Sequence, residues 1–250
     1  FSHHLYEEFV KAFRNIPDAT IALADLLNDK KANTRKVAVE ILAGLNDPIS
    51  VKPLIERLSD SDENVRYAAI KTASHLNDRT TMGPLIEILT SKNEKEGVRA
   101  AAAEALGQLN FPEAILTLID MLNTDGTHVV TAAAKALGKL GDPIAVLPLI
   151  DCLVHFNDLL WVDDDRYHPL GFGNVCSATY GALRQLNSPT AISPLIQQLN
   201  HKNANVREVV SSLLGDLNDQ TAVLPLIERL ADQSELVRYS GAACNIVSWA

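Results

Sequence analysis

Hydrophobic positions recur along this chain in short blocks that match one another, such as PLIERL and PLIDCL. The steps between successive blocks are 31, 31, 33, 31, 46 and 31 residues. The blocks begin at Ala22, Pro53, Pro84, Thr117, Pro148, Pro194 and Pro225. A fixed period of this size predicts a solenoid of stacked repeats, each with a first helix (helix A) at the block.

A second recurring position, which we call the landmark, is apolar in every unit except at Thr34 and predicts the start of the second helix of the unit (helix B). The landmark lies 19 residues before the next block in all six intervals. The landmarks are Thr34, Val65, Val98, Val129, Val175, Val206 and Val237. From Val65 to Leu76 the apolar residues follow i, i+3, i+4 spacing with alanines in the middle, which predicts a closely packed amphipathic helix. Twelve residues after each of the first six landmarks stands Asn or Gly, which tolerates the left-handed conformation that ends a helix.

We therefore predict an all-α, right-handed α-solenoid of HEAT-like helix pairs, seven units plus an N-terminal half unit, with residues 1–250 as a single solenoid. The half unit is expected over His3–Arg14. At the other end, Ile246, Val247 and Trp249 form an apolar stretch. That stretch is either a terminal cap or a docking end for another protein.

Composition narrows the class of protein. Of the 250 residues, 47% are hydrophobic and only 5% aromatic, which favours packed helices over a sheet sandwich. The net charge of −9 disfavours a nucleic-acid partner. Apolar runs are too short for a membrane span, and the first residues do not form a secretory signal. Three cysteines without a CxxC pair argue against disulfides or zinc and fit a reducing compartment.

The residue after each landmark forms a row of arginines with one gap. The row reads Arg35, Arg66, Arg99, Val130, Cys176, Arg207 and Arg238. Stacked repeats place these positions above one another, so we expect a ladder of pairs with turn acids such as Asp60, Asp62 or Asp232. Anion binding by the row is the alternative.

The 46-residue step marks an insertion over residues 155–174. Ile55 and Val65 are 10 residues apart, whereas Ile150 and Val175 are 25 apart, so 15 residues are added. We expect all of them in the A-to-B turn of unit five, on one edge of the solenoid.

Three interpretations of the insertion remain open. Its segment contains Trp161, the carboxylates Asp163, Asp164 and Asp165, and then Arg166, Tyr167 and His168. It can be a loop that fills the gap in the arginine row, anchored by Trp161. It can also contact a ligand or partner, because aromatic rings cover flat molecules and Arg or His pairs with carboxylates. A metal site would need His168 to complete the acidic set.

The pattern LxDxDxxVRxAA…ALGxLxD resembles the HEAT-like repeats of the phycobilin lyase family. The run DDDRYHPLGFGNVCSATYGALRQL is similar to the long acidic turn of the E subunits of E/F-type phycobilin lyases. In this run His168 interrupts the family's Tyr-Pro-Leu, and Cys176 replaces the expected Arg.

The resemblance implies a phycobilin lyase or lyase-like chaperone. As substrate it would hold a linear tetrapyrrole, phycocyanobilin or phycoerythrobilin, with no permanently bound cofactor. It would present the bilin to a cysteine of a phycobiliprotein alpha or beta subunit. A second lyase subunit, or self-association through the solenoid end, is a further possible partner. The implied location is the cytoplasm, either cyanobacterial cytosol or plastid stroma.

The resemblance also suggests roles for individual residues. Asp163–Asp165 would position the protonated pyrroles, and the aromatic side chains would hold the ring plane. Tyr180 and Arg184, on the helix after the insertion, would contact a ring and a propionate. The alternative for each of these two is an ordinary solvated helix residue.

Two functions other than that of a lyase are associated with similar repeats, an iron-dependent hydroxylase and a non-enzymatic adaptor. Deoxyhypusine hydroxylase has similar repeats but binds iron through His-Glu pairs, and this chain contains no His-Glu dipeptide. A non-enzymatic HEAT-repeat adaptor, acting in assembly or disassembly of phycobiliproteins or other partners, is the alternative that remains.

Overall fold

The computed structural model describes residues 8, 10–12, 16, 19–45, 48–76, 78–124, 126–159 and 172–243. All regular secondary structure in these residues is helical. The chain divides into two compact bodies, residues 1–114 and residues 115–250.

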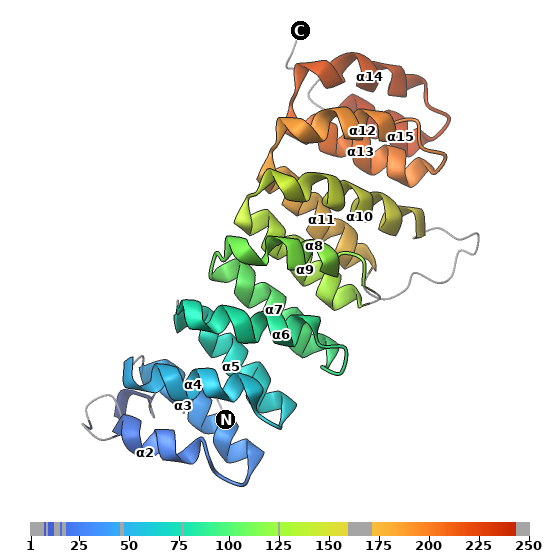
Figure 1. The fold of residues 1–250 in the computed structure, drawn as a ribbon. Helices are drawn as coiled ribbons and strands as arrows, with labels where there is room; N and C mark the ends of the chain where they lie inside the picture. The colour runs from blue at the N-terminus through green and yellow to red at the C-terminus, as the bar shows by residue number, and fades with distance from the viewer. Residues whose placement is uncertain are drawn as a thin grey trace. The chain divides into compact units, whose positions relative to one another are not determined.

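The N-terminal body contains the helix pairs of units one to three (Figure 1). Unit one is α2 (Ala19–Leu26) and α3 (Ala32–Leu45), unit two is α4 (Val51–Glu56) and α5 (Glu63–Leu76), and unit three is α6 (Met82–Thr90) and α7 (Glu96–Gln108). Most of the predicted half unit over 3–14 lies outside the described residues.

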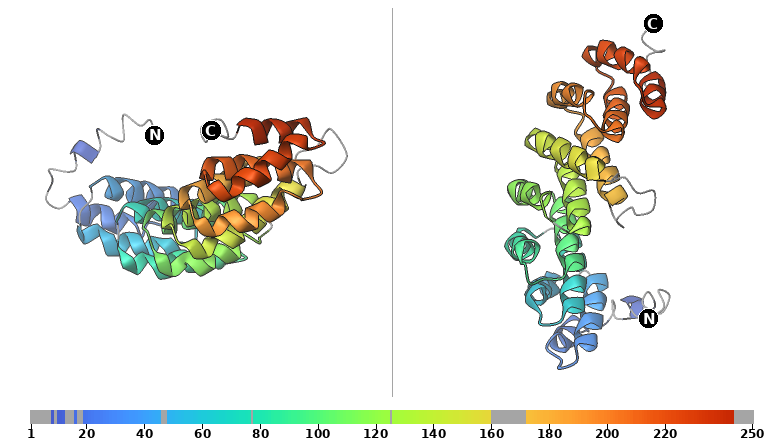
Figure 2. Two further views of the ribbon diagram at one scale, coloured as in Figure 1. Left: turned by 90° about the horizontal axis from the view of Figure 1, so that it is seen from above. Right: turned by 90° about the vertical axis from the view of Figure 1, so that its right-hand side faces the viewer.

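The C-terminal body contains units four to seven. These are α8 (Ile115–Met121) with α9 (Thr127–Leu140), α10 (Val146–Leu159) with α11 (Phe172–Leu186), α12 (Ile192–Gln198) with α13 (Ala204–Leu217), and α14 (Val223–Glu228) with α15 (Glu235–Ala243). Within this body the helices A form one layer and the helices B another (Figure 2). The predicted all-α solenoid of helix pairs is confirmed.

The core follows the predicted stripe. Val65, Ala69 and Ala73 are buried, and so is the central leucine of each block from unit two to unit seven. These leucines are Leu54, Leu85, Leu118, Leu149, Leu195 and Leu226.

Helix ends also agree with the prediction where they are described. The backbone φ is 54° at Asn110, 41° at Asn187, 54° at Asn218 and 74° at Gly141. Asn and Gly accept this left-handed conformation at low cost, so the turn to the next unit is fixed locally.

The arginine row forms a ladder between units. Arg35 donates to Asp60 from Nε at 2.8 Å and from Nη2 at 2.6 Å. Arg207 holds Asp232 in the same way at 2.9 and 2.8 Å, and Arg66 holds Glu94 at 2.6 and 2.7 Å. The ladder prediction is thus confirmed at these rungs.

Each ladder arginine also secures the turn of its own unit. The Nη1 atoms of Arg35, Arg66 and Arg207 donate to the carbonyl oxygen six residues earlier, at 2.9, 2.6 and 2.9 Å. Arg99 has a different bond, from Nε to the Leu89 carbonyl oxygen at 2.9 Å. One planar guanidinium therefore joins two successive turns.

Asp62, which we also considered as a partner of a ladder arginine, instead binds backbone N–H groups at the start of α5. Its Oδ1 accepts the backbone N–H groups of Asn64 and Val65 at 2.9 and 3.3 Å. It caps helix α5, and Asp60 alone accepts the bidentate pair from Arg35.

The ladder pairs shift carboxylate pKa values downward. The hydrogen bonds from Arg207 lower the pKa of Asp232, outweighing the opposing effect of burial. At Asp60 burial is the largest effect and raises the pKa, but Arg35 and the Asp62 N–H together lower it below its usual range. Both carboxylates are nearly buried, at 5% and 3% side-chain exposure, so these pairs couple folding to pH.

Replacing Asp232 by Asn should destabilise the fold by about 1–3 kcal/mol, because Arg207 loses its charged partner. Urea unfolding at pH 7 measures this, and Glu228→Gln, an exposed carboxylate on the same turn, is the matched control. Because the folded pKa of Asp232 is lowered, its contribution is present above about pH 4, the unfolded value, and is lost as pH falls through the folded value. Equal stability of Asp232→Asn and the native chain at pH 7 would contradict the ladder's role.

Candidate functional site at the junction of units five and six

Helix α10 is unusually long. It contains 14 residues, whereas the equivalent helices α8 and α12 contain seven. We predicted that all the added residues lie in the turn. Instead, 14 − 7 = 7 additional residues are helical and lengthen helix A by about two turns. The helix continues because Leu149, Leu153 and Phe156 extend its buried stripe at i+4 and i+3 spacing.

The added turns of α10 contact the A-to-B turn of unit six. Asp158 Oδ1 accepts a hydrogen bond from Asn203 Nδ2 at 3.2 Å, and its Oδ2 lies 3.8 Å from Lys202 Nζ. Asn157, just before it, is buried and donates from Nδ2 to the Leu153 carbonyl oxygen at 2.8 Å. Polar groups at the end of α10 are thus satisfied within units five and six.

The ladder changes both of its partners at this junction. Cys176 stands at the arginine position of unit five, and His201 stands where units two and seven carry Asp60 and Asp232. The two aspartates each accept the backbone N–H two residues later, and His201 does the same through Nδ1, from Asn203 at 3.2 Å. The His201 imidazole thus replaces a carboxylate as the acceptor of this turn. A carboxylate is not required here, because unit five has Cys176 and not Arg at the ladder position.

At the preceding rung, between units four and five, close packing replaces the ion pair. Val130 at the arginine position is fully buried. A Cβ added to Gly138 of α9 would lie 2.9 Å from the Ala182 Cα of α11, so these two helices B approach through small residues. At Val130 itself, full burial of an apolar side chain stands in place of the arginine.

The cysteines of unit five are unsuited to act as nucleophiles. Burial raises the pKa of Cys176 to about 12, although its place near the start of α11 would favour a lowered value. Burial also raises the pKa of Cys152 to about 11, and its Sγ lies 3.8 Å from Thr179 Oγ1. Both thiols remain protonated at neutral pH.

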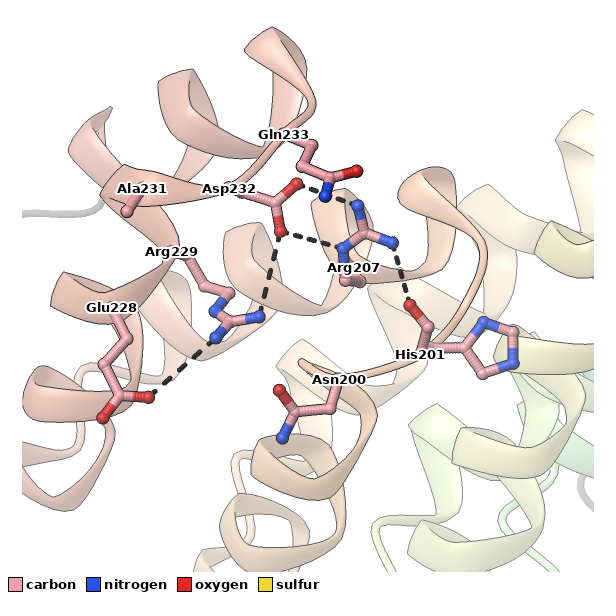
Figure 3. A pocket seen from close by; sticks show the side chains of 8 residues that line it. All are labelled: Asn200, His201, Arg207, Glu228, Arg229, Ala231, Asp232 and Gln233. Carbon is pink, nitrogen blue, oxygen red and sulfur yellow. Dashed lines mark hydrogen bonds and ion pairs between the residues drawn. The ribbon is translucent and has the colours of Figure 1, made fainter.

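A polar pocket of about 320 Å³ adjoins the junction on units six and seven. Arg207, Asp232 and Arg229 form its inner wall, where the ladder pair lies (Figure 3). Asn200, His201, Glu228, Ala231 and Gln233 complete the lining. Asp232 lies 2.8 Å from Arg207 and 3.8 Å from Arg229, so it balances part of the positive charge of the pocket.

On the helix B layer, Tyr180 and Arg184 meet at one carboxylate. The Tyr180 hydroxyl donates to Asp216 Oδ2 at 2.6 Å and lies 3.2 Å from Ser212 Oγ. Arg184 Nε lies 2.9 Å from the same Oδ2. Asp216 comes from the next unit, 36 residues after Tyr180, and sequence spacing gave no signal for this contact.

The other predicted site residues lie outside the described residues. These are Trp161, Asp163, Asp164, Asp165, Arg166, Tyr167 and His168. The structure therefore describes the two helix ends that flank them, Leu159 and Phe172.

In the described part of the chain, no group of three or more His, Cys, Asp or Glu side chains could hold a metal ion. No described helix has the length and apolar character of a membrane span.

The Tyr180 hydroxyl should resist ionisation. Burial is the main cause that raises its pKa to about 12, and the Asp216 carboxylate adds to the effect. In an NMR titration of ring-labelled tyrosine, the signal that disappears in Tyr180→Phe should remain in its neutral form at pH 11. Titration of that signal with a midpoint near 10 would show that the Tyr180–Asp216 contact is not formed.

Comparison with known proteins gives the family. Models of HEAT repeats match residues 20–97, 82–160 and 172–244. No curated protein matches the sequence.

Three solved structures are among those similar to this chain. A structure of the CpcE–CpcF complex of phycocyanin lyase from Nostoc sp. PCC7120 is 25% identical, with a TM-score of 0.52 over 77% of this chain and 74% of the matched one. Human deoxyhypusine hydroxylase is 17% identical, with a TM-score of 0.45 over 94% of this chain and 96% of that one. Kap95p, in a structure with RanGDP, is 13% identical, with a TM-score of 0.48 over 95% and 41%.

The last two similarities concern the fold only. The repeat period, the helix pairs and the match of HEAT-repeat models over most of the sequence agree with one another. The chain belongs to the HEAT-repeat family.

Proposed function

We propose that the protein is a phycobilin lyase or lyase-like chaperone, which holds a linear tetrapyrrole and presents it to a cysteine of a phycobiliprotein subunit. The observation that carries this proposal is the similarity to the CpcE–CpcF complex of phycocyanin lyase, at 25% identity over 77% of the chain. The acidic run after α10 supports it, because this run resembles the long turn of E-type lyase subunits.

In this proposal the residues between α10 and α11 contact the bilin. Asp163, Asp164 and Asp165 accept hydrogen bonds from protonated pyrrole nitrogens, which favours the cationic form of the chromophore. Trp161 and Tyr167 cover the ring plane, and Arg166 and His168 pair with propionates.

Tyr180 and Arg184 would complete the site on the helix B layer. Arg184 is 58% exposed, and a guanidinium has five N–H donors, so it can bind a propionate while Nε stays on Asp216. The Tyr180 ring can stack on a pyrrole while its hydroxyl remains bonded to Asp216. Asp216 would thus hold both side chains in place before the ligand binds.

The reaction would be completed by the acceptor protein. The sulfur of its cysteine adds to the bilin's ethylidene carbon, and the thiol proton passes to the tetrapyrrole, so no atom is lost. The raised pKa values of Cys152 and Cys176, about 11 and 12, disfavour attachment to this chain itself. Its contribution to catalysis is positioning and protection of the bilin.

Mixing the protein with phycocyanobilin or phycoerythrobilin should give a red-shifted, sharpened absorption band. The band should disappear in Asp163→Ala/Asp164→Ala/Asp165→Ala. The variant Asp25→Ala/Glu56→Ala/Glu87→Ala removes the same charge from exposed positions of the N-terminal body and should leave the band unchanged. If neither bilin changes its spectrum, the proposal that the protein binds a bilin is wrong. Co-purification with a phycobiliprotein would then indicate an adaptor.

Lyase activity itself is tested by co-expression of the protein with phycobiliprotein subunits and a bilin supply. A covalent adduct should form on a subunit cysteine, detected by mass spectrometry and by fluorescence in denaturing gels. Adduct yields that are the same with and without this protein would leave a chaperone or adaptor role and exclude a lyase.

A further inference from the structure

The charged side chains on the helices A of the C-terminal body are all acidic. Helices α8, α10, α12 and α14 contain no Lys or Arg. They carry the carboxylates Asp120, Asp151, Asp158 and Glu228. Asp158 is engaged with the turn of unit six, and Glu228 lies 3.9 Å from Arg229. Among the described residues, Asp120 and Asp151 have no ion-pair partner.

Three large aliphatic side chains are exposed beside these two carboxylates. Leu116 is 64% exposed, and Ile144 and Leu147 are each 55% exposed. Leu116 and Leu147 occupy equivalent positions in units four and five, and Ile144 lies one turn before Leu147. In unit six the equivalent positions carry Thr190 and Ser193, so the patch ends there.

The spacing places the acids at one edge of the aliphatic residues. Asp120 follows Leu116 by four residues in α8, and Asp151 follows Leu147 by four in α10, so each pair shares a helix face. Exposed aliphatic residues at equivalent positions of successive units, with acids at one edge, are a pattern found at protein-binding surfaces.

We infer that this surface docks an amphipathic helix of a partner protein, with Leu or Ile residues in its centre and Lys or Arg residues along one side. The charge selects this occupant, because the partner's cations would face Asp120 and Asp151 while its aliphatic residues cover Leu116, Ile144 and Leu147. A second copy of this chain is disfavoured, since its own helix A layer would bring acids against acids. The inference does not depend on the proposed bilin function.

The test uses a synthetic 18-residue helix of Leu and Lys, with Leu at i, i+3, i+4 and i+7 spacing, and a second peptide with Glu in place of Lys. Fluorescence anisotropy should show micromolar binding of the Lys peptide only, weakening as salt is raised. Leu116→Ser/Leu147→Ser should weaken binding at least tenfold. Asp120→Lys/Asp151→Lys should reverse the preference in favour of the Glu peptide.

A matched control comes from α14, where Leu224 and Glu228 have the same i, i+4 spacing but the preceding helix α12 carries Ser193 at the equivalent position. Leu224→Ser/Glu228→Lys should bind the Lys peptide like the native chain. Circular dichroism checks that every variant is folded, as is expected for exposed positions. Unchanged binding by the Leu116/Leu147 variant, or an equal loss in the α14 control, would overturn the assignment. Self-association that the Leu116/Leu147 variant abolishes would instead identify a second copy as the occupant.

Discussion

The bidentate pair between a ladder arginine and the acid of the next turn links successive units at three of the described junctions, Arg35–Asp60, Arg66–Glu94 and Arg207–Asp232. A helix pair buries only one side of each helix against its own partner, so the stack needs a device that fixes the offset between units. Arg207 provides it by donating to its own turn at the His201 carbonyl oxygen and to Asp232 of the next unit at once. The apolar core supplies the driving force for stacking, and the ladder sets the register.

Units five and six stack on one another without an arginine–carboxylate pair at the ladder positions. Cys176 and His201 replace the arginine and the acid, and the added turns of α10 hold the next turn through Asp158 instead. The substitution of both partners together avoids a buried unpaired charge, which a single change would leave. The helices α10 and α11 that flank the segment with the acidic run both belong to unit five, and Asp216 of unit six fixes Tyr180 and Arg184 within the helix B layer.

Local chemistry made much of the fold predictable. The helix pairs follow from the spacing of apolar residues, and the helix ends from Asn and Gly, which accept a positive φ. Contacts that depend on the positions of neighbouring units were not predictable. Asp60 and Asp62 are equivalent as candidates in the sequence, and only the path of the turn makes Asp60 the ladder partner. The two added turns of α10 escaped prediction because the step between repeats counts residues without saying whether they are helical. Phe156 and Leu153 carried that signal, in spacing that continues the stripe of α10.

The proposed function requires a linear tetrapyrrole to bind at the segment between α10 and α11, beside Tyr180 and Arg184. Hydrogen–deuterium exchange with and without phycocyanobilin reports where the ligand orders the backbone. Bilin binding should slow exchange in peptides covering residues 155–186 and leave the N-terminal body unchanged. No protection in that region, or protection confined to residues 19–108, would contradict it.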